Sequence, residues 1–119
     1  MRTGICAAVL SGDTILLDRG GTRLRYCNVW APALGTPIGD ALKEYNQKLV
    51  LGKALRYLPN GHVHWDSAAI IADVYVADPS QGVEKSLWVN QELRFWLARR
   101  IKAPVWQDGI PGDDNPATL

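Results

Sequence analysis

Two residue types suited to chemistry at a phosphate occur near the start of the chain. Asp13 stands in a Ser-Gly-Asp-Thr turn, and Arg25 follows after a Gly-Gly hairpin. A carboxylate can hold a hard cation, and a guanidinium can clamp a phosphate. Phosphodiester cleavage uses both, together with a base that takes a proton from water. The structural alternatives are that Asp13 is a turn residue that bonds its own backbone and that Arg25 is paired with Asp13 or Asp18.

Aromatic and basic side chains offer a second kind of chemistry, the binding of a base or a phosphate. Trp30 opens a loop with two prolines, where its indole can fill a pocket or offer a stacking surface. Trp88 and Trp96 fit the core and rim of a helix. A basic cluster near the end of the chain fits either a solvated helix end or a phosphate-contacting patch. This basic cluster consists of Arg94, Arg99, Arg100 and Lys102.

Histidine and cysteine pairs are candidates for metal or thiol chemistry. His62 and His64 fall on one face of a predicted strand, where two imidazoles could chelate a metal, but no third ligand is evident. Exposed strand histidines are the simpler interpretation. Cys6 and Cys27 favour reduced, buried thiols over an inter-strand disulfide or a redox or metal role, because two cysteines do not make a disulfide scaffold.

Length and charge limit the classes of function. The chain has 119 residues, a length that corresponds to one domain, and a net charge of +1. A non-specific nucleic-acid binder usually carries a clear basic excess, so this balance disfavours that class. The apolar run at residues 5–10 is too short for a membrane span or a signal core. We therefore expect a cytoplasmic protein, or a part of a longer one, without a membrane partner.

Hydrophobic periodicity predicts the elements that hold these residues. Strand patterns occur at residues 5–10, 14–18, 23–29, 53–58, 62–65 and 69–77. Apolar stripes predict one helix between Ile38 and Gly52 and a second helix at residues 87–101. Short strands with glycine turns, and a helix between them, fit a small OB-type Greek-key barrel. We assign residues 1–106 to this domain and residues 107–119 to a flexible tail rich in Pro, Gly and Asp.

Five segments of the chain together carry a family resemblance. They are Gly12–Thr14 with Arg23–Pro32, then Gly39–Ala41, Gln47–Leu55, Ile71–Val76, and Leu87–Leu93 with Leu97–Arg99. In this order they resemble the staphylococcal nuclease (thermonuclease-like) family from residue 5 to residue 102. The resemblance implies an α+β fold, a five-stranded OB-fold Greek-key barrel with two helices. The last helix of that family has no counterpart in the Pro-rich tail.

The resemblance also implies roles for individual residues. Asp13 matches the family's first metal carboxylate, and Arg25 matches its first phosphate-clamping arginine. The positions of the other metal-binding Asp, the catalytic Glu and the second arginine hold Trp30, Ala33, and either Ala69 or Ile70. Loss of a general base alone typically costs about 10²–10⁴ in rate. The vestigial pair Asp13 and Arg25 therefore indicates a site that has lost catalysis.

These observations lead to two functional hypotheses. The first is a nuclease-like pseudoenzyme without a cofactor, which binds nucleic acid or a protein partner, or serves in assembly, through Arg25, Trp30 and the basic cluster. The alternative is a metal-dependent phosphodiesterase, a DNA or RNA nuclease, whose rearranged site uses Asp13 and Arg25 with Ca²⁺ or Mg²⁺. Such a site would need other groups, and the only nearby candidates are Glu44, His62, His64 and Asp66, none of which stands at a site position of the family. A third possibility is an oligomer that uses exposed tryptophans at the mouth of the loop.

Overall fold

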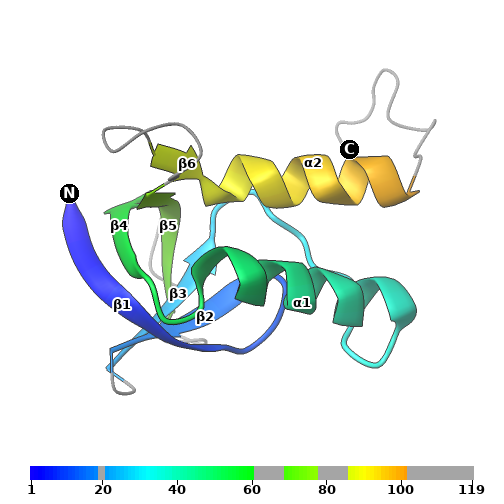
Figure 1. The fold of residues 1–119 in the computed structure, drawn as a ribbon, viewed down its shortest axis with the longest axis horizontal. Coiled ribbons are helices and arrows are strands. Elements are labelled where there is room, and N and C mark those ends of the chain that lie inside the picture. Colours follow the sequence, from blue (N-terminus) through cyan, green and yellow to red (C-terminus); the bar gives the residue numbers. More distant parts are fainter. Residues whose placement is uncertain (19–20, 61–68, 78–85, 102–119) are drawn as a thin grey trace.

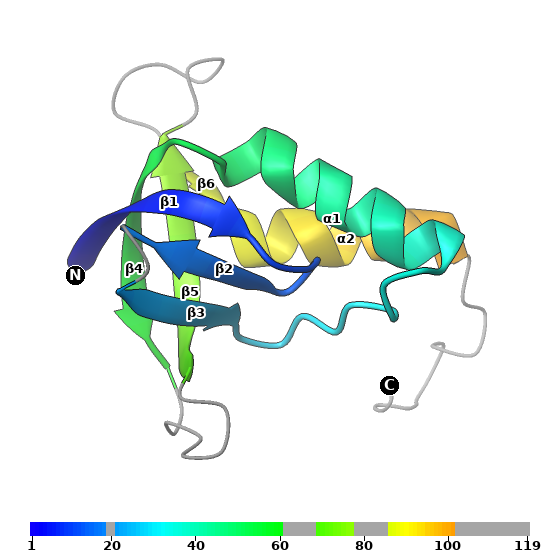
Figure 2. The same cartoon turned by 90° about the horizontal axis from the view of Figure 1, so that it is seen from below.

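Six strands and two helices make up the described part of the chain, which the computed structural model gives as residues 1–18, 21–60, 69–77 and 86–101. The strands are β1 (Arg2–Val9), β2 (Thr14–Leu17), β3 (Thr22–Tyr26), β4 (Ala54–Pro59), β5 (Ala69–Ala77) and β6 (Ser86–Trp88). The helices are α1 (Pro37–Val50) and α2 (Val89–Ile101). Figures 1 and 2 show them side by side, away from β4. Within these ranges, neither helix is long and apolar enough to cross a membrane.

Five of the strands close into a barrel. The order is β3-β2-β1-β4-β5, and β3 also pairs with β5 in parallel, from Arg23 opposite Ala69 to Tyr26 opposite Ala72. β6 then pairs antiparallel with the last part of β5. With α1 inserted between β3 and β4, this is the five-stranded Greek-key arrangement of an OB-fold. The predicted α+β barrel with two helices is confirmed, with β6 as an added strand.

The barrel interior is apolar and is covered at one side by the two helices. Leu42 of α1 and Val89 and Leu93 of α2 are buried with the inward side chains of the strands. The predicted apolar stripes of both helices therefore face the core. α1 begins after Thr36, whose hydroxyl oxygen accepts a hydrogen bond from the Gly39 amide at 3.1 Å, a standard N-cap.

The end of β3 differs from the prediction. Simple alternation places Leu24, Tyr26 and Asn28 on the same face of the strand. Leu24 and Tyr26 are buried, but the strand ends at Tyr26, and Asn28 is exposed with φ of +60°. A residue with positive φ turns the chain out of the strand direction. Val29 is therefore buried in place of Asn28.

The start of α2 also differs, because residues 87 and 88 belong to β6. Leu87 pairs with Val76, and Trp88 pairs with Tyr75, whose ring stacks on the indole with centroids 6.4 Å apart. Strand pairing and this aromatic pair outweigh the helical pattern. Of the other predicted elements, the strand at 62–65, part of the hairpin at 19–20 and the tail at 107–119 lie outside the described residues.

A buried asparagine fastens α1 to the barrel. The Asn46 side-chain oxygen accepts a hydrogen bond from the Tyr26 hydroxyl at 2.7 Å, and its amide donates to the Ser11 carbonyl at 3.1 Å. Asn46 has no exposed surface. Because buried amide groups must be paired to be tolerated, these bonds fix the position of α1 over β3 and the β1–β2 turn.

A second buried asparagine, Asn90 of α2, forms hydrogen bonds with β5 between the part of that strand that pairs with β3 and the part that pairs with β6. Its side-chain oxygen accepts from the Val74 amide at 2.8 Å. Its side-chain amide donates to the carbonyls of Cys27 at 3.0 Å and Ala72 at 3.1 Å. One amide thus supplies the hydrogen bonds that a neighbouring strand would otherwise provide at this point.

We predict that Asn90→Ala lowers the free energy of unfolding by about 2–3 kcal/mol, because it leaves the buried Val74 amide without its acceptor and removes two donations. Urea denaturation followed by circular dichroism measures the change. Gln91→Ala, at the next position of α2, is the control and is expected to stay within about 0.5 kcal/mol. Equal losses for the two variants would contradict the prediction.

Candidate binding site

The carboxylate of Asp13 is fully engaged by neighbouring groups of the protein. The hydroxyls of Ser11 and Thr14 donate to its Oδ1 at 2.8 and 2.9 Å. The Ala31 amide donates to Oδ2 at 3.4 Å, and the Arg25 Nε lies 4.0 Å from the same oxygen. Asp13 therefore ties the β1–β2 turn to the loop after β3. Of the sequence alternatives, the pairing of Arg25 with Asp13 is confirmed.

Asp18, the other carboxylate considered for Arg25, has a different role. Its side chain accepts a hydrogen bond from the Ile5 amide at 3.1 Å, and its backbone has a φ of +48°. It therefore supports the turn after β2, at the end of β2 opposite from Asp13.

The described part of the chain contains no group of three or more His, Cys, Asp or Glu side chains arranged to hold a metal ion. A cation at Asp13 would have to displace hydroxyl and amide donors that already occupy the carboxylate oxygens. Ca²⁺ takes six to eight oxygen ligands, so this single carboxylate is a poor fit for it. His62, His64 and Asp66, named above as possible additional groups, lie outside the described residues.

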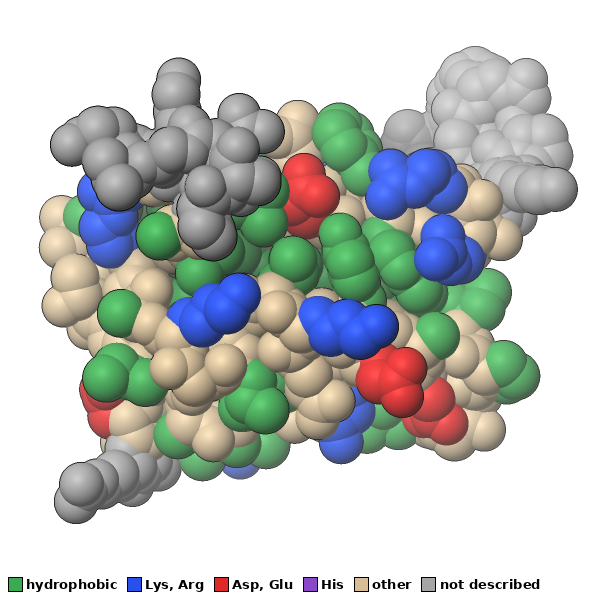
Figure 3. All heavy atoms as spheres, in the orientation of Figure 1, with side chains coloured by type: hydrophobic (Ala, Val, Ile, Leu, Met, Phe, Trp, Pro, Cys, Tyr) green, Lys and Arg blue, Asp and Glu red, His purple; other side chains and the backbone are tan. Residues whose placement is uncertain are grey.

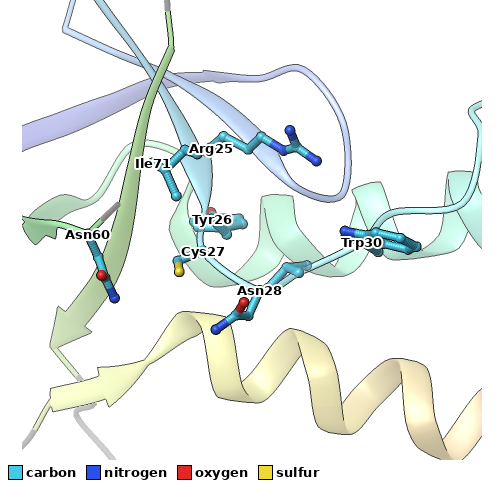
Figure 4. Close-up of a pocket in the computed structure, with 8 residues that line it drawn as sticks. Arg25, Tyr26, Cys27, Asn28, Trp30, Asn60 and Ile71 are labelled. Atoms are coloured by element: carbon cyan, nitrogen blue, oxygen red, sulfur yellow. The ribbon is translucent and has the colours of Figure 1, made fainter. Parts of the chain in front are cut away.

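Trp30 projects into solvent and does not fill a pocket. Its side chain is 82% exposed, and Figure 4 shows the indole standing on the loop beyond the end of β3. The interpretation that this indole occupies the place of a lost metal is therefore wrong, and the stacking-surface alternative matches its position. The loop beneath it is held by the buried Val29 on one side and by the Asp13–Ala31 hydrogen bond on the other.

A shallow pocket of about 270 Å³ lies beside Trp30, along the end of β3 (Figure 4). Its lining combines a guanidinium, two amides, a thiol and an indole. The residues are Arg25, Tyr26, Cys27, Asn28, Val29, Trp30, Asn60 and Ile71. We call the pocket and the exposed indole beside it the mouth. The Arg25 side chain is 42% exposed, so its guanidinium can meet a ligand while it stays near Asp13.

Asn28 and Asn60 are mouth residues that the sequence interpretation did not single out. The side-chain amide of Asn60 donates to Asp73 at 2.8 Å, which holds it at the pocket edge, whereas Asn28 is exposed. Asparagine favours turns and tolerates positive φ, and this preference is the sequence signal that could have indicated both residues. Asn28 adopts positive φ, and Asn60 follows Pro59 at the end of β4.

The thiol of Cys27 lines the mouth in its protonated form. Burial raises the pKa of Cys27, the charge of Asp73 raises it further, and the charge of Arg94 opposes both. A thiol with a raised pKa is a weak nucleophile. Cys6 and Cys27 are both free, Cys6 is buried and Cys27 partly buried, so the disulfide alternative is wrong.

The basic cluster predicted on α2 is divided between two sides of the helix. The charge of Arg94 acts on the pKa of Cys27, at the mouth. Arg99 and Arg100 instead act on the pKa of Tyr45, which burial raises and which belongs to α1. The Arg100 guanidinium also lies 4.4 Å from the ring centroid of Trp96, a largely buried side chain that stacks on Tyr45.

Lys102, the last member of the cluster, lies outside the described residues. None of the described arginines of the cluster lines the pocket, and the charge of Arg94 acts on Cys27, which does. On the face seen in Figure 3, the Lys and Arg side chains are scattered among apolar and acidic ones.

The two alanines at the positions that the resemblance compares with catalytic residues contribute no functional group. Ala33 is exposed, and its carbonyl accepts from the Thr36 hydroxyl at 2.6 Å before α1. Ala69 is buried at the start of β5, opposite Arg23 rather than Arg25. Ile70 is partly buried and packs against the core. The methyl side chains of Ala33 and Ala69 can neither activate water nor hold a phosphate.

Comparisons with protein-family models and with curated proteins find no match to this chain.

We predict that Asp13→Asn lowers the free energy of unfolding by about 1–3 kcal/mol, equally with and without added Ca²⁺. The amide places an N–H where Oδ1 or Oδ2 accepts hydrogen bonds, which leaves at least one donor unpaired. Thermal unfolding in each buffer measures both effects. Glu44→Gln, at an exposed position of α1, is the control. A Ca²⁺-dependent rise in the wild-type midpoint that Asp13→Asn abolishes would contradict the structural role of Asp13.

Proposed function

We propose that this chain is a nuclease-like OB-fold domain without hydrolytic activity, and that it acts as a binding module. Two lines support the proposal. The five segments of the sequence resemble the staphylococcal nuclease family, and the barrel has the strand order and helix insertion that this resemblance implies. The loop after β3, where such an enzyme would keep an acid and a base, presents Trp30 and Ala33.

The observation that carries the proposal is the state of Asp13. Its oxygens accept from Ser11, Thr14 and Ala31 and lie beside Arg25, so the carboxylate serves to hold the loop. A phosphodiesterase needs an open ligand position on its metal and a nearby base. The described mouth offers an indole, a guanidinium and amides instead, which are groups for recognition.

Single-stranded nucleic acid is the first candidate ligand. The exposed face of Trp30 can stack on a base, since stacking on aromatic side chains tolerates any sequence. The guanidinium of Arg25 can contact a phosphate, and the amides of Asn28 and Asn60 can pair with base edges. One or two cationic contacts and a net charge of +1 give modest affinity, so a protein partner with an acidic or amide-rich segment is the second candidate.

A nuclease assay separates this proposal from the rearranged phosphodiesterase. The purified chain is incubated with single-stranded and duplex DNA and RNA in the presence of Ca²⁺, Mg²⁺ or Mn²⁺, and the products are resolved on denaturing gels. We expect intact substrate in every mixture. Metal-dependent cleavage that Asp13→Asn abolishes would overturn the proposed loss of catalysis.

For ligand binding, we predict that Trp30→Ala weakens the affinity for a short single-stranded oligonucleotide by roughly 5- to 150-fold, which corresponds to the loss of about 1–3 kcal/mol of stacking. Fluorescence anisotropy of a labelled oligonucleotide measures the affinity at several salt concentrations. The control variant Phe95→Ala removes another exposed aromatic ring, on α2, and is expected to leave the affinity for the oligonucleotide unchanged. Equal losses in both variants would place the ligand elsewhere than the mouth.

A further inference from the structure

The outward face of the sheet formed by β1, β4, β5 and β6 joins side chains that lie far apart in the sequence. One row across the strands pairs Thr3 with Arg56, Arg56 with Tyr75 and Tyr75 with Trp88. On one side of this row Leu58 pairs with Asp73, and on its other side Ile5 pairs with Ala54. Residues that lie directly opposite each other on adjacent strands have their side chains close enough to be in contact. We call this surface the outer sheet face.

The outer sheet face exposes more apolar surface than one isolated side chain would. Ile5 is 53% exposed, Leu58 is 47% exposed and Trp88 is 37% exposed, three of the eight large hydrophobic side chains that are exposed in the described part of the chain. Tyr75 lies between Arg56 and Trp88 and stacks on Trp88, whereas Ile5 and Leu58 lie on opposite sides of this row. Exposed Tyr, Trp and aliphatic side chains around an Arg are typical of protein–protein interfaces.

The face is distinct from the mouth and from the helices. Figures 1 and 2 both show β4 at the end of the molecule away from α1 and α2. The mouth lies at the end of β3, with Trp30 on the loop that leads to α1. The hydrogen bond from Asn60 to Asp73 marks where the two surfaces meet.

The charges on the outer sheet face identify what can cover it. Arg56 and Asp73 have opposite charges and occupy diagonal positions on adjacent strands. Arg56 donates to the Ser86 hydroxyl, and Asp73 accepts from Asn60 and Trp88 at one edge of the same face. A two-fold axis between the two positions would place Arg56 of each copy against Asp73 of the other. A surface of this kind is complementary to itself, as an isologous interface requires.

We propose that the outer sheet face binds a second copy of this chain and forms a two-fold symmetric dimer. Ile5, Leu58 and Trp88 supply apolar contacts around Arg56 and Tyr75, and the Arg56–Asp73 pairs set its orientation. The net charge of +1 opposes association very little.

Sedimentation velocity and light scattering of the full chain over a concentration series test the proposal. We expect a dimer whose dissociation constant rises at least about tenfold in Leu58→Lys, because a charge replaces an apolar contact within the interface. Leu51→Lys is the matched control, since Leu51 is 45% exposed at the end of α1, and its dimer is expected to be unchanged.

A charge exchange provides a second test. Arg56→Asp is expected to weaken the dimer, and the combined Arg56→Asp and Asp73→Arg variant is expected to recover most of the affinity, since the pairs re-form across the axis. Circular dichroism verifies that each variant is folded. A chain that stays monomeric at every concentration, or a dimer weakened equally by Leu58→Lys and Leu51→Lys, would overturn the proposal.

Discussion

The edge of β5 is the constraint on which the rest of the structure depends. This strand pairs with β3 up to Ala72 and with β6 from Tyr75 onward, so its backbone changes partner within three residues. Asn90 supplies the missing hydrogen bonds in between, to Val74 and Ala72. A buried backbone amide without a partner costs about as much as a lost hydrogen bond. The barrel can therefore close on β3 and still extend to β6, because one side chain of α2 occupies the junction.

The same junction positions the mouth. The Cys27 amide donates to the Ala72 carbonyl at 2.9 Å, and its carbonyl accepts from Asn90, so the chain is held for one residue beyond β3. Positive φ at Asn28 then turns the chain and brings Val29 into the core. The next side chain, Trp30, is exposed. It therefore stands directly after the point at which the barrel closes.

The sequence predicts the barrel well because strand alternation and glycine turns are local signals. Its failures occur where distant partners decide. Trp88 joins β6 because Tyr75 offers a strand edge and a ring to stack on, and neither is visible from residue spacing. Asn46 and Asn90 look like ordinary polar helix residues, since their hydrogen-bond partners lie 16 to 63 positions away in the sequence. The position of Trp30 depends on one residue with positive φ, which alternation cannot foresee.

The site itself divides into residues that the fold uses and residues that it does not. Asp13 and Arg25 form an ion pair at the β1–β2 turn, and Asp13 also holds Ala31, so both contribute to structure without a metal. Trp30 and Ala33 are exposed, and changes in their side chains leave the core untouched. Substitutions at these two positions are therefore expected to cost little stability. What they alter is the set of groups that the mouth presents to a ligand.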